Sequence, residues 1–208
     1  MSEEIIKINS DDNIILEGLY DPGTKKHGVI ITHPHPLYGG DMYNNVVEAI
    51  QSAYQKKGYA TLRFNFRGVG ASGGTYDDGI GEQKDIIAGY KFLKTMDVEQ
   101  IDLCGYSFGT WVNAQIKDQI TVNSSIMVSP PVAMMKFETD LKINHLILAV
   151  TGSEDGFAPP ELVEKFVSNL NGTADIKVID GADHFFLGYE DKLAEIVDSY
   201  IADRQLGK

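Results

Sequence analysis

A serine between two glycines is the first group of residues in this sequence that could do chemistry. Ser107 lies in Gly105-Tyr-Ser-Phe-Gly109, after an apolar run and before a stretch with helical spacing. This pattern is typical of a nucleophile elbow, in which a sharp strand-to-helix turn exposes a serine hydroxyl at a sheet edge. Glycine allows the turn because it has no Cβ, and the helix N-terminus that follows favours developing negative charge. We therefore expect Ser107 to be a nucleophile.

Two plainer interpretations of this segment stay open. A pentapeptide with three fixed positions can arise by chance or simply end a strand. Cys104 could be a thiol nucleophile, but a free cysteine inside an apolar strand is usually a small buried hydrophobic residue. As the only cysteine in the sequence, it has no partner for an internal disulfide.

A serine hydroxyl needs a base to take its proton, and histidine is the usual base at neutral pH. His184 lies in the loop GADHFF, between an apolar run and the last helical stretch. The acid that orients it should come from another strand end, between nucleophile and base in chain order. Asp155, in SEDGFAPP, meets this requirement, with Glu154 as the neighbouring alternative. A turn-forming aspartate and an ordinary loop histidine are the structural interpretations of these two positions.

The other four histidines have different explanations. His27 falls in a polar loop and His145 inside a predicted strand, so we expect both to be structural or solvated. His33 and His35 form a His-Pro-His segment that, together with Asp41, could bind zinc. Prolines restrict both rings and no further histidine follows closely, so we expect no metal and no cofactor.

Attack of the serine on a carbonyl creates an oxyanion, which two fixed N–H donors must stabilise. Phe108, directly after Ser107, supplies one backbone N–H. The second should come from the loop HPHPLYGG, whose prolines have no N–H. The amides of His35 and Leu37 remain, and we favour His35 with Leu37 as the alternative.

A parallel sheet is needed to bring these residues together. Short runs rich in Val, Ile and Leu alternate with helical patterns, which predicts an α/β fold with helices on both faces. In such sheets the reactive residues gather at the carboxyl edge. We find no linker in the 208 residues and expect one domain, 1–208. The predicted strands are 5–8, 14–20, 28–32, 59–66, 101–105, 125–129, 145–151 and 176–179, and the predicted helices are 44–57, 83–94, 108–116, 160–170 and 190–201.

The composition restricts the partners. A formal net charge of −12 would repel the phosphates of nucleic acids and of anionic membranes. The N-terminus is acidic where a signal peptide needs a basic start, and the apolar runs are too short to span a bilayer. We expect a cytoplasmic monomer or homodimer whose partner is a small-molecule substrate.

One glycine-rich segment suggests a different function. Residues 68–73 match the dinucleotide fingerprint G-x-G-x-x-G and follow a predicted strand. That fingerprint opens a helix directly, whereas here GTYDDGIGE intervenes and Arg67 precedes the motif. We expect a loop near the rim of the active site and no nucleotide.

With these residues assembled, the chain resembles the α/β-hydrolase superfamily over nearly its full length. HPHPLYGGDMYNNVV, FNFRGVGASGGTYDDGIGE and GYSFG are similar to stretches of small bacterial and archaeal predicted hydrolases. The resemblance implies an α/β-hydrolase fold with about eight mostly parallel strands, helices on both faces and no cap domain. It also implies Ser107 as nucleophile, Asp155 as acid and His184 as base. Prolines stand where the superfamily commonly has glycine in the HG loop, so the second oxyanion donor stays open.

The segment PPVAMMKFETDLK is too short to hold the cap that many α/β-hydrolases insert at this point. We therefore expect an open, shallow pocket. We expect the protein to cleave small carboxylic esters through an acyl-enzyme. Thioesters, peptides or perhydrolysis on the same three residues are alternatives, and so is a binding or scaffold protein without catalysis. Methionine and aromatic residues here are more often core than pocket. The candidate pocket residues are Tyr38, Met134, Met135 and Phe157, with Leu37 and Phe137 as further neighbours.

Overall fold

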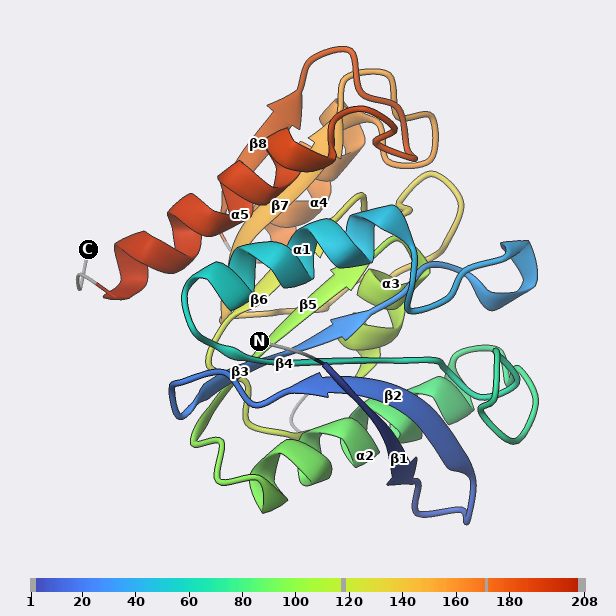
Figure 1. Cartoon of the computed structure of the whole chain (residues 1–208). Helices are drawn as coiled ribbons and strands as arrows, with labels where there is room; N and C mark the ends of the chain where they lie inside the picture. The colour runs from blue at the N-terminus through green and yellow to red at the C-terminus, as the bar shows by residue number, and fades with distance from the viewer. Residues whose placement is uncertain (1–2, 117–118, 171, 206–208) are drawn as a thin grey trace.

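The computed structural model describes residues 3–116, 119–170 and 172–205 of the chain (Figure 1). Residues 1–2, 117–118, 171 and 206–208 of the expected domain 1–208 lie outside this range. The strands are β1 (Glu4–Asn9), β2 (Ile15–Asp21), β3 (His27–Thr32), β4 (Ala60–Phe64), β5 (Gln100–Tyr106), β6 (Ser125–Val128), β7 (Leu146–Gly152) and β8 (Asp175–Ile179).

These strands form one eight-stranded sheet in the order β1-β2-β4-β3-β5-β6-β7-β8. Strand β2 runs antiparallel to both of its neighbours, β1 and β4. The pairs from β4 across to β8 are all parallel, so their carboxyl ends meet at one edge. The mostly parallel eight-stranded sheet expected from the sequence is confirmed.

Helices cover both faces of this sheet, as the sequence predicts (Figure 1). Apolar residues of α1 and α5 share one core cluster, and those of α2 and α3 share the cluster on the opposite face. The third cluster joins α4 to β6 and β7. Within the described residues, every helix is too short or too polar to cross a bilayer. The helices are η1 (Pro36–Tyr38, a 3-10 turn), α1 (Asn45–Lys56), α2 (Ile80–Thr95), α3 (Phe108–Gln115), α4 (Pro160–Leu170) and α5 (Glu190–Gln205).

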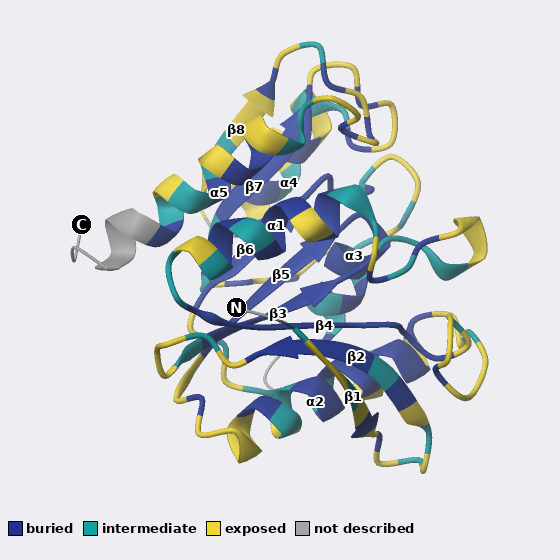
Figure 2. Cartoon of the chain, in the orientation of Figure 1, coloured by how far each residue is buried: buried dark blue, intermediate teal, exposed yellow. Residues whose placement is uncertain are grey.

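The central strands are buried on both faces, which explains their near-continuous apolar sequence (Figure 2). Val29 and Ile31 of β3 pack into the cluster that contains α1 and α5, while Ile30 packs into the cluster of α2 and α3. Side chains alternate between the faces of a strand in this way. Each fully buried side chain of this size contributes about 1.5–3 kcal/mol.

Most element boundaries differ from the predictions by one to four residues, and His27, predicted in a polar loop, is the first residue of β3. Two of these differences have a clear physical cause. Helix α2 begins at Ile80 and not at residue 83, because the Glu82 carboxylate accepts the backbone N–H of Gly79 at 2.8 Å and caps the first turn. Strand β7 begins at Leu146, so the prediction that His145 lies inside the strand is wrong. The amide of Leu146 turns back to a carbonyl oxygen three residues earlier, at 3.0 Å, and the chain enters the sheet only afterwards.

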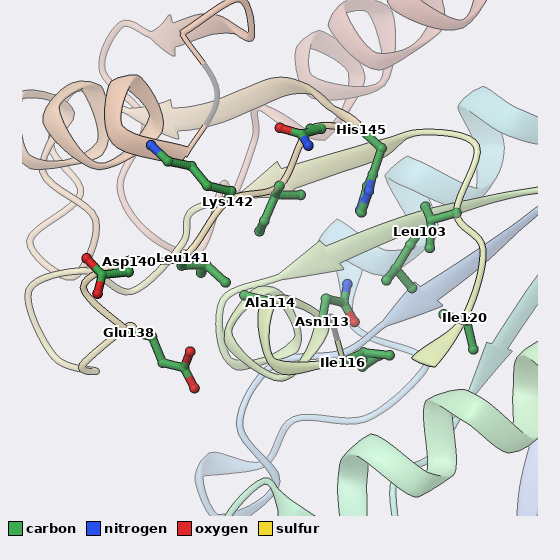
Figure 3. A pocket seen from close by; sticks show the side chains of 13 residues that line it. Leu103, Asn113, Ala114, Ile116, Ile120, Glu138, Asp140, Leu141, Lys142 and His145 are labelled. Carbon is green, nitrogen blue, oxygen red and sulfur yellow. The ribbon is translucent and has the colours of Figure 1, made fainter. Parts of the chain in front are cut away.

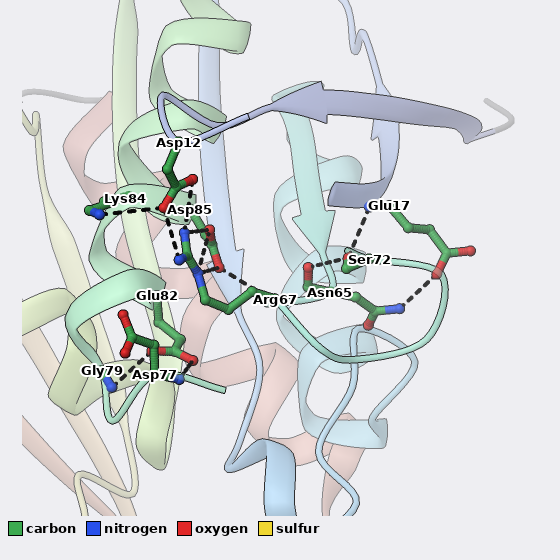
Figure 4. Close-up of polar contacts among 10 residues, drawn as sticks. All are labelled: Asp12, Glu17, Asn65, Arg67, Ser72, Asp77, Gly79, Glu82, Lys84 and Asp85. Atoms are coloured by element: carbon green, nitrogen blue, oxygen red, sulfur yellow. Dashed lines mark hydrogen bonds and ion pairs between the residues drawn. The ribbon is translucent and has the colours of Figure 1, made fainter. Parts of the chain in front are cut away.

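The glycine-rich segment 68–73 leads into a loop, as predicted, and the next helix begins only at Ile80. A buried ion-pair network anchors the base of this loop (Figure 4). The Arg67 guanidinium donates to Asp85 of α2 (Nη2 to Oδ1, 2.7 Å) and to Asp12 (Nη1 to Oδ2, 3.0 Å). Burial disfavours the charged guanidinium, but these two carboxylates raise the pKa of Arg67 above its ordinary value. The loop is therefore held by side chains from two distant parts of the chain.

Candidate active site

Ser107 lies on the turn between β5 and α3, with φ 52° and ψ −119°. This is a sparsely populated backbone conformation for a residue with a side chain, and it persists only where the surroundings impose it. A Cβ added at Gly105 would come within 2.8 Å of the Thr110 amide nitrogen. A Cβ at Gly109 would come within 2.5 Å of Thr32 Oγ1. Close packing against α3 and β3 therefore requires both glycines of the motif.

Three side chains predicted from the sequence lie together at the carboxyl edge of the sheet. His184 Nε2 lies 2.9 Å from Ser107 Oγ. The Nδ1 atom of the same ring lies 2.9 and 3.0 Å from the two carboxylate oxygens of Asp155. All three residues are buried, whereas Glu154, the alternative acid, is exposed. With its Nδ1–H donating to the carboxylate, His184 presents Nε2 as the acceptor for the serine hydroxyl proton.

Asp155 is held by more than the histidine. The Ser129 hydroxyl donates to Oδ2 at 2.6 Å, and the amides of Phe157 and Ala158 donate to Oδ1 at 2.9 and 2.8 Å. Burial acts to raise the pKa of Asp155, but the hydrogen bonds from His184, Ser129 and Ala158 hold it below its ordinary value. The carboxyl group is therefore ionised at neutral pH and fixed in direction.

Two supporting residues were missed by the sequence analysis. Ser129, directly after β6, has φ 46° and directs its hydroxyl at Asp155. Tyr106, the residue before Ser107, donates its hydroxyl to the backbone oxygen of His184 at 2.7 Å. Both lie at the carboxyl ends of parallel strands, and that position is the signal that could have found them.

The loop after β3 adjoins the start of α3, because the rings of His35 and Phe108 are 4.6 Å apart between centroids. The N–H of Leu37 donates to His35 Nδ1 at 3.2 Å. The backbone oxygen of His35 accepts the amides of Tyr38 and Gly40, at 3.1 and 3.0 Å. The amide of Leu37 is therefore already engaged within its own loop.

The buried ring of His33 holds this loop through hydrogen bonds to the backbone. The ring is buried, with Nδ1 at 2.7 Å from the Pro34 carbonyl oxygen and Nε2 accepting the Phe66 amide at 3.0 Å. Burial lowers the pKa of His33 to about 4, so the ring is neutral at physiological pH. Because both nitrogens are bonded to the backbone, neither has a lone pair directed at a metal, which argues against the zinc alternative.

The predicted pocket residues divide into two groups. The Phe157 ring lies against His184, with centroids 4.7 Å apart, and Tyr38 lies against His35 at 4.9 Å. Leu37 and Tyr38 are exposed on the loop after β3. These residues therefore flank the site.

The candidates on the loop after β6 are placed differently. Met134 is exposed, whereas Met135 is partly buried against the cluster that contains α2 and α3. Phe137 packs on Phe166 of α4, with ring centroids 4.3 Å apart, and joins the third core cluster. Phe137 is therefore a packing residue and not a pocket residue.

A cavity of about 400 Å³ lies elsewhere, between α3 and the segment 138–145 (Figure 3). Its lining includes His145 and Asn113 but not Ser107, His184 or Asp155. The cavity is therefore separate from the Ser107 hydroxyl.

Comparison with known proteins places the chain among hydrolases. The profile of the dienelactone hydrolase family matches residues 22–205. An uncharacterized protein of Rickettsia prowazekii is 32% identical over 201 residues, which cover 89% of this chain and 84% of that protein. An α/β serine hydrolase homologue from Coxiella burnetii is 35% identical with a TM-score of 0.87, over 96% of this chain and 98% of that one. XC6422 from Xanthomonas campestris, described as an α/β serine hydrolase without lid, is 24% identical with a TM-score of 0.89, over 98% and 95% of the two chains, and shows the fold alone.

Proposed function

Because this chain belongs to the dienelactone hydrolase family of α/β-hydrolases, we propose that it is a serine hydrolase that cleaves small carboxylic esters. The family makes it a hydrolase, and the ester substrate is the part that we add. One observation carries the proposal: His184 lies 2.9 Å from the Ser107 hydroxyl through one nitrogen and 2.9 Å from Asp155 through the other.

In the proposed reaction His184 Nε2 takes the Ser107 proton as the hydroxyl oxygen attacks the ester carbonyl carbon. Asp155 stabilises the imidazolium that forms. The carbonyl electron pair moves onto its oxygen, and two backbone N–H groups bind that oxyanion. Phe108 is the first residue of α3, so its N–H has no partner within the helix. We assign the second donor to His35, because the Leu37 amide is engaged by the His35 ring.

Collapse of this intermediate expels the alcohol, which takes the proton from His184, and leaves the acyl group on Ser107. Water then attacks the acyl-enzyme while His184 takes its proton; the bond to Ser107 breaks, His184 returns the proton to the serine oxygen, and the acid is released. Cys104 takes no part, because it is buried in β5 and burial raises the pKa of its thiol. The nucleophile of the proposal is therefore an alcohol and not a thiolate.

Replacing Ser107 tests the proposal. We expect Ser107→Ala to lower the turnover of p-nitrophenyl acetate and butyrate by on the order of 10⁶-fold. Cys104→Ser is the matched control and should retain turnover, although with some loss of stability. A fluorophosphonate probe should label the wild type at Ser107, as located by mass spectrometry.

Two outcomes would contradict this function. If the Ser107→Ala variant hydrolyses both esters as fast as the wild type, another group is the nucleophile. A folded wild type that neither turns over esters nor takes the probe would favour a binding or scaffold protein. A panel of esters, thioesters and amides with one common acyl group then separates the substrate classes.

A further inference from the structure

The proposed ester chemistry fixes where one half of the substrate must lie, so a subsite for that half rests on the proposed function. When the tetrahedral intermediate collapses, the bond from its carbon to the alcohol oxygen breaks and the bonding pair goes to that oxygen. The oxygen takes the proton from His184 Nε2, and the carbonyl double bond re-forms. The alcohol oxygen must therefore lie within hydrogen-bonding distance of Nε2, and its substituent must contact whatever surrounds the His184 ring.

Aromatic rings surround His184. The centroids of Phe157, Tyr106 and Phe185 lie 4.7, 5.5 and 5.7 Å from that of the histidine. Tyr106 is buried and bonded to the backbone of His184, so it belongs to the support of the ring. Phe157 and Phe185 are 40% and 54% exposed. The accessible surroundings of the base are therefore formed by two phenylalanine side chains.

The loops that present these two rings are already fixed. The Phe157 amide donates to Asp155 Oδ1 at 2.9 Å, so the backbone that carries this ring is bonded to the carboxylate that orients the base. The Phe185 amide donates to Asp183 Oδ1 at 2.9 Å, and its backbone oxygen accepts from Asn45 Nδ2 at 3.0 Å. A ligand that meets two rings on fixed loops has little ordering to bring about, which favours binding.

The two loops that carry these phenylalanines are acidic. The stretches 152–161 and 180–190, which carry them, contain no lysine or arginine. They contain six carboxylates instead: Glu154, Asp155, Glu161, Asp180, Asp183 and Glu190. An alcohol that carries an anionic group would be repelled here, whereas a neutral one would not.

We propose that Phe157 and Phe185 form the subsite for the alcohol of the substrate and select neutral aromatic alcohols over small or anionic ones. Aromatic rings attract one another in edge-to-face and offset geometries and bury a large apolar surface. The acyl half of the substrate takes no part in this selection. Specificity for the alcohol therefore comes from two exposed side chains beside the base.

Three butyrate esters test the subsite: ethyl, benzyl and 4-carboxybenzyl butyrate. The three share one acyl group, and benzyl alcohol and its carboxylated form differ chiefly in charge. We expect Phe157→Ala and Phe185→Ala each to lower kcat/KM for benzyl butyrate by about five- to tenfold more than for ethyl butyrate. The wild type should cleave 4-carboxybenzyl butyrate about tenfold more slowly than benzyl butyrate, with the gap closing at high salt.

The matched control is Ile5→Ala, which removes another exposed apolar side chain but on β1, at the far edge of the sheet from β8. It should leave all three rates unchanged. Phe157→Leu and Phe185→Leu repeat the measurement if an alanine variant fails to fold, with a smaller loss in the same direction.

Failure of the subsite and failure of the proposed function give different results. If each phenylalanine variant loses the same factor on ethyl and benzyl butyrate, or loses nothing on either, the subsite is wrong while the function stands. If the wild type cleaves none of the esters and Ser107 takes no fluorophosphonate, the function itself is wrong.

Discussion

Removing the Ser129 hydroxyl is expected to slow the reaction without dismantling the site. This hydroxyl donates to Asp155 Oδ2 at 2.6 Å, and both side chains are buried. In Ser129→Ala the carboxylate keeps its bonds to His184 and to two backbone amides on Oδ1. It loses one of the constraints on its direction, and among the described residues Oδ2 keeps only His184 as a donor.

The magnitude follows from the kind of bond that is lost. A hydrogen bond to an ionised group contributes about 1.5–3 kcal/mol. In the transition state Asp155 faces a full imidazolium. If about half of the upper value stabilises that state relative to the ground state, its loss raises the barrier by about 1.4 kcal/mol and lowers kcat about tenfold. The unfolding free energy at neutral pH should fall by about 1.5–3 kcal/mol, since the lost bond stabilises the folded carboxylate.

The pH dependence of this loss has a definite sign. Ser129 is one of the groups that hold the pKa of Asp155 below its ordinary value. A lowered carboxyl pKa stabilises the folded state above the unfolded pKa, and this stability is lost as pH falls through the folded pKa. The stability gap between the wild type and Ser129→Ala should therefore be full at neutral pH and close in acid.

Two further variants isolate the hydroxyl. Ser129→Gly also removes it but suits φ 46° better, so it should be more stable than Ser129→Ala and equally slow. Ser124→Ala, just before the other end of β6, removes a buried hydroxyl that has no hydrogen-bond partner among the described residues. It should keep wild-type kcat. The assay is kcat and KM on p-nitrophenyl butyrate from pH 5 to 9, beside urea unfolding. Wild-type kcat and an unshifted pH profile in both Ser129 variants would refute a positioning role.

Three other predictions concern the fold. Gly109→Ala places a Cβ 2.6 Å from a β3 carbonyl oxygen and should lower the free energy of chemical unfolding by about 1–3 kcal/mol. Gly156→Ala, whose Cβ would have nothing within 4 Å, should leave it unchanged, and equal effects of the two changes would contradict the packing argument. The hydrogen bond from Arg67 lowers the pKa of Asp12 to about 2, and the carboxylate is partly exposed. The free energy of unfolding in urea should therefore be lower in Asp12→Asn than in the wild type by under about 1 kcal/mol, and this difference should disappear as pH falls from about 4 to about 2. A difference that does not depend on pH would contradict the role of the ionised carboxylate. Burial raises the pKa of the Cys104 thiol, so a disulfide reagent should modify it only after unfolding, and rapid reaction in the native protein would be inconsistent with that burial.

Sequence patterns predicted the strands, the helices and the three side chains at the sheet edge because each depends on local spacing. Ser107, Asp155 and His184 each follow an apolar run, and parallel strands bring such positions to one edge. Their catalytic roles remain predictions. Its place at a strand end could have marked Ser129 as a candidate, but its partner could not be assigned. The contact with Asp155 depends on which strands are neighbours, and local spacing does not give the order of the strands in the sheet.

Loop detail was also beyond local patterns. The choice between the amides of His35 and Leu37 depends on a side chain that folds back on its own loop, at 3.2 Å. Helix α2 starts early because Glu82 is buried at its first turn, although the stretch before it has the composition of a loop. Such features depend on tertiary contacts and not on hydrophobic period.

The buried hydroxyl of Tyr106 has a mechanical consequence. It fastens the loop that carries His184 to the strand that carries Ser107, so the two cannot drift apart while that bond persists. A fluctuation that separates them must first break this buried hydrogen bond, which lies at the end of a strand in the middle of the sheet.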